Sequence, residues 1–288
     1  MKDTAITCYV DNDRNIINEF GWLYKSWLYS GSWLVSDIVA FYNPTIDPLS
    51  LPQDKGVILI PLVPYSDKYP KWNNYKFINS VGFMAEPEVG LLAEYKYVMR
   101  TDCDCFLTPY FRDLRPRLTT FGAGQYTQVP SVTVRLMGVA ERWNISPIFT
   151  NVGSTLIGYS NKVMMYSLVH LEYCNRLRNE EFTDEDFGRN DLGEWPGWYA
   201  GVLTMYAGQL AAQAYFGQAM NIGGLDVHCM CHDDISPNDY HIHAWHSWED
   251  FSKLKWRKGE YAEQDMDALH ITKISDYCLW IAGRGPAV

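Results

Sequence analysis

Strand and helix signals alternate along the first third of the chain, and this alternation limits the fold more than any other feature. β-prone runs at 6–10, 35–42 and 57–63 end at turn residues or at a proline, and a helical pattern over 15–29 separates the first two. The run 57–63 is continuously apolar, which predicts a strand buried on both faces. Such alternation predicts an α/β fold built from βαβ units.

The rest of the chain continues the pattern more loosely. We expect an aromatic loop over 65–75, helical segments over 76–84 and 87–95, and a strand over 97–106 that runs into an acidic turn. Further along, the pattern predicts strands at 147–150 and 155–159, helices over 162–179 and 199–219 with a charged loop between them, and a β-prone run at 240–246. We interpret residues 1–288 as one domain, with a nucleotide-binding half over about 1–110 and an acceptor half over about 111–288 that ends in a metal-completing C-terminal segment.

The charge balance narrows the classes of partner. The chain carries 24 basic and 34 acidic residues, a formal net charge of −10, which argues against nucleic acid and against an anionic membrane surface. The first residues lack the pattern of a signal peptide, and the longest apolar run is too short to span a membrane. Seven cysteines without the spacing of a disulfide scaffold indicate a reducing compartment, so we expect a cytoplasmic protein.

Two carboxylates stand two residues apart in Asp102-Cys103-Asp104, where the strand that begins at Tyr97 ends. Ligands of α/β sheets bind beyond the carboxyl ends of the strands. A carboxylate pair in that place can bind Mg²⁺ or Mn²⁺ together with phosphate oxygens, and the cation offsets the charge of a leaving diphosphate. The alternative is a solvated acidic turn.

A second group of candidate ligands lies in the histidine-rich segment 241–246. Along a strand, His241 and His243 point to the same face. Imidazole nitrogen suits Mn²⁺ better than Mg²⁺, so we predict His243, and after it His246, as a further metal ligand beside the two aspartates. The alternative is that these histidines make ordinary hydrogen bonds.

Four blocks in the same order resemble those of the GT-A-fold nucleotide-sugar glycosyltransferases. The segment 97–107 is similar to their Asp-x-Asp strand, 149–158 to the Asn-x-Gly block of retaining members, and 194–198 to their acidic block. The segment 241–246, followed by Lys253, is similar to the C-terminal histidine that completes their metal site and the lysine that reaches the diphosphate. The first block also resembles glycosyltransferase-like domains of algae and of the large DNA viruses that infect them, the chloroviruses.

This resemblance implies a GT-A-like (Rossmann-like) fold with a mixed, mostly parallel central sheet flanked by helices. It implies a metal-dependent glycosyltransferase that moves a sugar from a nucleoside-diphosphate sugar, with UDP favoured, to a carbohydrate acceptor, with retention slightly favoured. The cation would be Mn²⁺ or Mg²⁺, held by Asp102, Asp104, His243 and His246. A viral member would work in the host cytoplasm.

Three residues are candidates for the sugar side of the site. Asn151 matches the asparagine that contacts the donor sugar in that family. Glu194 precedes the apolar segment 195–198, and apolar neighbours raise the pKa of a carboxyl group and fix its position. It could stabilise or attack the sugar in a retaining reaction, or take the acceptor proton in an inverting one. Asp191 is the second choice, and a helix N-cap is the alternative role for either carboxylate.

Nucleotide contacts are expected at the ends of strands. Tyr9, Val10 and Asp11 end the first predicted strand, Tyr65 follows the third and offers a ring for uracil, and Lys76 opens a helix where a basic residue contacts the diphosphate. The remaining predicted contacts are Asp102, Cys103 and Lys253.

Two other functions fit parts of the sequence. A sugar nucleotidyltransferase also uses paired carboxylates and Mg²⁺, but it would carry a glycine-rich phosphate loop, and residues 11–15 contain no glycine. A non-catalytic carbohydrate-binding protein would explain the aromatic content of 15% but has no need of the two aspartates. The Cys and His residues of 228–234 lack the usual zinc spacing, so we expect a surface loop with buried thiols there, with structural zinc as the alternative.

Overall fold

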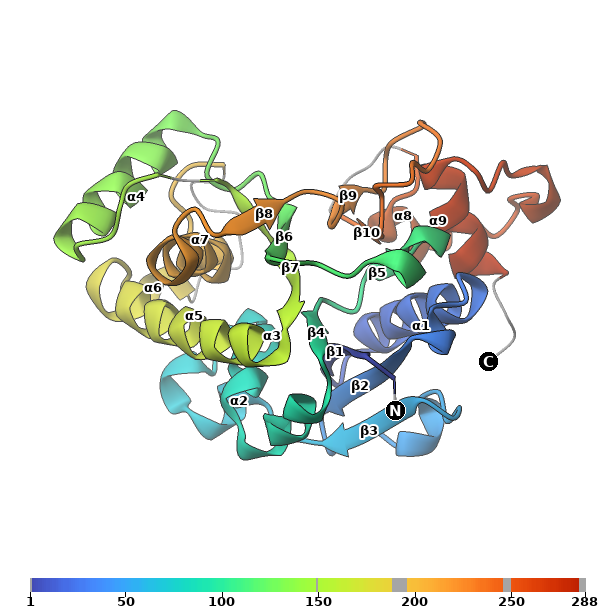
Figure 1. Ribbon diagram of the computed structural model, residues 1–288, viewed down its shortest axis with the longest axis horizontal. Coiled ribbons are helices and arrows are strands. Elements are labelled where there is room, and N and C mark those ends of the chain that lie inside the picture. Colours follow the sequence, from blue (N-terminus) through green and yellow to red (C-terminus); the bar gives the residue numbers. More distant parts are fainter. Residues whose placement is uncertain (1, 149, 188–195, 246–249, 285–288) are drawn as a thin grey trace. The chain divides into compact units, whose positions relative to one another are not determined.

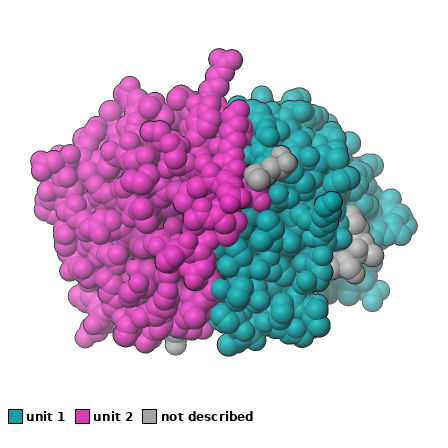
Figure 2. Space-filling model, turned by 60° about the horizontal axis from the view of Figure 1, so that its bottom comes forward, with its two compact units in different colours: residues 1–61, 101–115, 223–288 teal, residues 62–100, 116–222 magenta. Residues whose placement is uncertain are grey.

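The computed structural model describes residues 2–148, 150–187, 196–245 and 250–284 (Figure 1). The chain divides into two compact units, which Figure 2 shows in different colours. Unit 1 comprises residues 1–61, 101–115 and 223–288, and unit 2 comprises 62–100 and 116–222. Each unit combines stretches that are distant in the sequence. The border between them does not fall at residue 110, so the nucleotide-binding and acceptor halves stay a prediction.

The main-sheet strands of unit 1 have the order β3-β2-β1, and those of unit 2 have the order β4-β7-β6-β8. β2 pairs in parallel with β1 and β3, and β8 with β6, whereas β7 runs antiparallel to β4 and β6. The strands are β1 Thr4–Val10, β2 Ser36–Tyr42, β3 Val57–Pro61, β4 Tyr97–Arg100, β6 Thr119–Ala123, β7 Val152–Tyr159 and β8 Met220–Ile222. The predicted α/β fold with a mixed, mostly parallel sheet flanked by helices is confirmed.

The first helix and strand of unit 1 form where the sequence predicts them. Helix α1 (Arg14–Tyr29) begins after Asp13, whose carboxylate accepts a hydrogen bond from the N–H of Asn15 at 2.7 Å. β1 is buried along its whole length. The prediction that the run 57–63 is buried on both faces was wrong, because no residue of β3 is fully buried and Ile58 is 38% exposed. β3 is also the edge strand of its sheet. An edge strand pairs on one side only and stays open on the other.

A small sheet in unit 1 joins segments that are far apart in the sequence. Its order is β5 (Cys105–Leu107), β10 (His241–His243) and β9 (Val227–His228), and β10 runs antiparallel to β5. Ile242 points into an apolar core that includes Phe106. The neighbouring histidines of β10 therefore point to the other face, as predicted.

Two helices near the end of the chain complete unit 1. They are α8 (Lys253–Arg257) and α9 (Ile274–Gly283). α9 lies beside α1, although the two helices come from opposite ends of the sequence (Figure 1). Their contact buries Trp22 of α1 and Tyr277 of α9 in one apolar cluster.

Unit 2 is built around two long helices on β7. These are α5 (Ser160–Glu180) and α7 (Leu203–Phe216). They come close at Gly208, where an added Cβ would lie 3.3 Å from the ring of His170. Nε2 of His170 lies 2.8 Å from the carbonyl oxygen of Thr204, so a hydrogen bond also links the two helices. Helix α4 (Pro130–Arg142) adds its apolar face to the same core.

Several local predictions differ from the structure. The segment 65–75, expected as a loop, contains helix α2 (Tyr65–Lys68) and a 3₁₀ helix at Pro70–Trp72. Proline fits the first position of a helix, where no partner for its missing N–H is needed. The strand predicted at 147–150 is not formed by its described residues, because the chain turns at Asn151 (φ 55°) and β7 begins after it.

The remaining elements are short. They are α3 Asn79–Gly82, α6 Asp184–Phe187 and 3₁₀ helices at Ser32–Leu34, Pro48–Ser50, Lys76–Ile78, Phe83–Ala85, Pro87–Glu94, Pro109–Asp113, Ala200–Val202 and Met266–Ala268. In the part of the chain that the structure describes, no helix is long and apolar enough to cross a membrane. All seven cysteines are free thiols.

Candidate functional site

The second aspartate of Asp102-Cys103-Asp104 lies beside the histidine strand in unit 1. β5 begins at Cys105, and antiparallel pairing sets Cys105 opposite His243 of β10. The N–H of Ala244 donates to the carbonyl oxygen of Asp104 at 2.9 Å, so the pairing extends to Asp104 itself. The register of the small sheet therefore fixes Asp104 next to His243.

Asp104 is a buried carboxylate between two cations. Its side chain contacts the ammonium group of Lys253 through Oδ2, and its Oδ1 lies 3.3 Å from Nε2 of His243. Burial raises the pKa of this carboxyl group, but Lys253 and His243 lower it by more, so the net pKa lies well below the usual range. Asp104 is thus ionised and able to bind a cation.

His243 lies between two carboxylates. Its Nδ1 is 3.4 Å from Oδ1 of Asp226, on the side of the ring away from Asp104. Burial lowers the pKa of the imidazole, but Asp104 and Asp226 raise it by more, to about 10. The carboxylate beside Nδ1 fixes the ring, and both ring nitrogens carry a proton in the cation-free protein. A metal ion on Nε2 would therefore have to replace the proton there.

The neighbouring histidine has a structural role. Nδ1 of His241 accepts from the N–H of Asp226 at 3.1 Å, and Nε2 lies 2.9 Å from the hydroxyl oxygen of Thr101. Burial, opposed by Asp226, lowers the pKa of His241 to about 4. His241 is therefore neutral and holds the turn that carries Asp226.

These residues suit a hard divalent cation. Within the described ranges, the group of three side chains that could hold a metal ion is Asp104, Cys105 and His243, whose ligand atoms all lie within 4.8 Å of one another. Burial raises the pKa of the Cys105 thiol well above its usual value, so it stays protonated. A carboxylate and an imidazole then remain, a donor set that suits Mn²⁺. Asp102 is half-buried and not one of the three, and His246 lies outside the described residues.

Sequence reasoning missed three charged residues of this region, namely Asp226, Glu19 and Arg257. Asp226 has a φ of 54° and follows Gly223-Gly224, so the turn was recognisable but its proximity to His243 was not. Glu19 lies on the face of α1 that also carries Trp22 and Leu23, and it is 2% exposed. A carboxylate on an apolar helix face is a signal that could have been found.

The predicted nucleotide contacts fall in both units. In unit 1, Val10 is fully buried, and Asp11 follows it at the end of β1. The Cys103 thiol donates to the carbonyl oxygen of Tyr9 at 3.3 Å. In unit 2, Tyr65 is buried, with its ring against Gly82 and 4.3 Å from the ring of Tyr69. Lys76 is exposed at the start of a 3₁₀ helix.

The predicted sugar-side residues lie in unit 2 or outside the described residues. Oδ1 of Asn151 accepts from the N–H and hydroxyl of Thr127 at 3.2 and 2.7 Å, and its amide nitrogen contacts the carbonyl oxygen of Gly124, so this side chain braces the turn before β7. Asp191 and Glu194 are not among the described residues. Trp198 is stacked on the rings of Phe182 and Tyr206, which leaves its faces covered.

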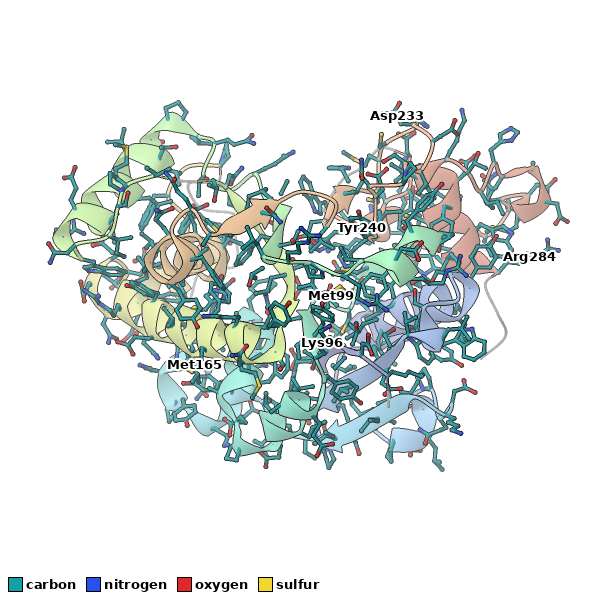
Figure 3. All side chains as sticks on the ribbon, viewed as in Figure 1. Lys96, Met99, Met165, Asp233, Tyr240 and Arg284 are labelled. Atoms are coloured by element: carbon teal, nitrogen blue, oxygen red, sulfur yellow. The ribbon has the colours of Figure 1, made fainter. Side chains whose placement is uncertain are left out.

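The Cys- and His-containing segment 228–234 forms a turn of unit 1. The thiol of Cys231 lies 3.1 Å from Oδ2 of Asp233, which is labelled in Figure 3, and Nε2 of His232 lies 2.8 Å from Asp250. Cys229 is fully buried and donates to the carbonyl oxygen of Phe251. These contacts agree with a loop carrying a buried thiol.

A family model described as "Domain of unknown function (DUF7164)" matches residues 54–278. The chain belongs to this family. No curated protein matches this DUF7164 member. Among solved structures, it is similar to the galactosyltransferase LgtC in complex with donor and acceptor sugar analogs, with a TM-score of 0.54 and 10% identity. The likeness covers 99% of this chain and 97% of that one, and it shows a shared fold.

Proposed function

We propose that this DUF7164 member is a divalent-cation-dependent glycosyltransferase that moves a sugar from a nucleoside-diphosphate sugar, with UDP favoured, to a carbohydrate acceptor. One observation carries the proposal. A buried, ionised aspartate of an Asp-x-Asp segment lies beside a half-buried histidine 139 positions later (243 − 104), in a chain with the fold of a galactosyltransferase. A carbohydrate-binding protein has no need of this pair.

Asp104 and His243 would hold Mn²⁺ or Mg²⁺, with Asp102 and His246 as the further proposed ligands. The cation supplies positive charge against the diphosphate that leaves the sugar. Asp226 keeps Nε2 of His243 turned toward Asp104, and the buried setting strengthens each of these charge contacts. Holding the reacting groups in place then contributes most of the rate.

The other predicted residues complete the proposal. Tyr9, Val10, Asp11 and Tyr65 would contact the nucleoside. The proposed diphosphate contacts are Lys76, Cys103 and Lys253. On the sugar side, Asn151 is proposed to contact the donor sugar. Glu194, with Asp191 as the second choice, is proposed to stabilise or attack the sugar, with retention slightly favoured. The likeness in fold and the block order of the sequence support these assignments.

The first test is a thermal-shift titration of the full chain with UDP, GDP and CMP, each with and without Mn²⁺. Ligands that bind the folded state raise the midpoint of unfolding. We expect UDP with Mn²⁺ to raise it most, and release of UDP from UDP-sugars should then require Mn²⁺. The Asp102→Asn and Asp104→Asn variants should each lose the Mn²⁺-dependent part of the shift.

Asp54→Asn is the matched control, because Asp54 is an exposed aspartate of the same unit and should keep the full shift. Circular dichroism confirms that each variant is folded. Asp102→Asn is the more robust variant, since Asp102 is less buried than Asp104. A folded wild-type protein that responds to no nucleotide would contradict the proposed function.

A further inference from the structure

Helix α8 has an ion pair at each of its two ends. At its start Lys253 contacts Asp104, and at its end Arg257 donates to Glu19 of α1 from Nη2 at 2.6 Å and Nε at 3.0 Å. Lys253 and Glu19 are almost fully buried, with 5% and 2% of their surfaces exposed. Both bonds from Arg257 go to Oε1 of Glu19.

The ammonium group of Lys253 is attracted by both carboxylates. Burial lowers its pKa, but Asp104 and then Glu19 raise it by more, and the net shift is upward. A buried ammonium group stays charged only beside such partners. Lys253 therefore serves as a counter-ion that is already inside the protein.

A divalent cation on Asp104 would disturb this arrangement. Both oxygens of the carboxylate already face positive groups, Oδ1 toward His243 and Oδ2 toward Lys253. A cation such as Mg²⁺ lies about 2 Å from a carboxylate oxygen, which brings it next to the ammonium group. Like charges this close in a buried place repel strongly. Lysine has a flexible four-carbon stem that lets its charge move away.

We propose that Lys253 is the built-in counter-ion of Asp104 in the cation-free protein, that a divalent cation displaces it, and that Glu19 retains the displaced ammonium group within the site. This inference rests on the proposed cation dependence. It assigns Glu19 as a positioning residue, because the bond to Arg257 fixes it to the helix that carries Lys253. It also predicts opposite effects for two neighbouring substitutions.

The test is the affinity for Mn²⁺ alone, measured by titration calorimetry without nucleotide. Lys253→Met removes the competing charge and keeps the stem, so Mn²⁺ should bind roughly tenfold tighter. Glu19→Gln takes away the site that receives the ammonium group, so Mn²⁺ should bind several-fold more weakly. In the Lys253→Met background, Glu19→Gln should lose most of its effect. Lys255→Met, on the same helix, is the matched control and should change nothing.

The outcomes separate this inference from the proposed function. Unchanged or weaker Mn²⁺ binding in Lys253→Met, or an equal effect of Glu19→Gln in both backgrounds, would overturn the inference and leave the proposed function standing. If neither the wild type nor Lys253→Met binds Mn²⁺, the inference and the proposed function are both overturned. If Lys253→Met does not fold, Lys253→Gln takes its place. A crystal structure of the wild type with Mn²⁺ gives a direct answer, since Nζ should then lie on Glu19 rather than on Asp104.

Discussion

Burial and neighbouring charges together decide the charge of single histidines in this protein. His243 is half-buried between two carboxylates, which raise its pKa to about 10, whereas burial lowers the pKa of His241 to about 4. His170 of unit 2 faces the carbonyl oxygen of Thr204, and burial, together with the charge of Arg100, lowers its pKa to about 3. At neutral pH His243 is thus charged, whereas His241 and His170 are neutral, because their neighbours differ.

The neutral His170 makes stability depend on pH. The unfolded chain takes up a proton at this residue near pH 6.5 and the folded chain near pH 3, so the contribution is fully present above pH 6.5 and is lost as the pH falls toward 3. Glutamine can donate the same bond to Thr204 but does not titrate. Between pH 7 and pH 4, urea titrations should show a smaller loss of unfolding free energy in His170→Gln than in the wild type, by about 3 kcal/mol. Equal losses in the two proteins would contradict this assignment.

Strand β5 is held in place by side chains from both ends of the chain, which hydrogen-bond to the backbone of Leu107. The N–H of Leu107 donates to the hydroxyl of Ser26 of α1 at 2.9 Å, and the carbonyl oxygen of Leu107 accepts from the hydroxyl of Tyr277 of α9 at 2.5 Å. All three residues are buried. Tyr240, labelled in Figure 3, precedes β10, and its carbonyl oxygen accepts from the N–H of Thr108 just after β5. Helices α1 and α9 therefore hold the strand that carries Asp104 toward its partners.

Removing either of these side-chain hydrogen bonds to Leu107 should lower the free energy of unfolding. Tyr277→Phe and Ser26→Ala each leave one buried backbone group of Leu107 without its partner, which costs about 1–3 kcal/mol of unfolding free energy. Urea unfolding followed by fluorescence measures the loss. Tyr159→Phe removes a hydroxyl from a tyrosine that is 42% exposed and should cost far less. Equal costs at Tyr277 and Tyr159 would show that the bond to Leu107 has no net effect.

For the molecule as a whole, the local pattern of the sequence predicted the α/β class because strand and helix periods are visible within a few residues. The resemblance to the GT-A glycosyltransferase blocks also selected Asp104, His243 and Lys253, which the structure brings together. It did not predict Asp226 or Glu19, because their roles depend on pairing between distant segments. Helix α4 was missed as well, since no side chain caps its start.

The interrupted course of unit 1 has a consequence for the chain as it leaves the ribosome. Every residue of unit 2 is made before residue 223, whereas unit 1 still lacks the stretch 223–288 at that moment. A nascent chain of this length exposes the unpaired edge of β5 and an aspartate without its buried cations. The proposed cation site therefore forms only after residues 223–288 have been made, and a shorter nascent chain carries the Asp-x-Asp segment without His243 and Lys253.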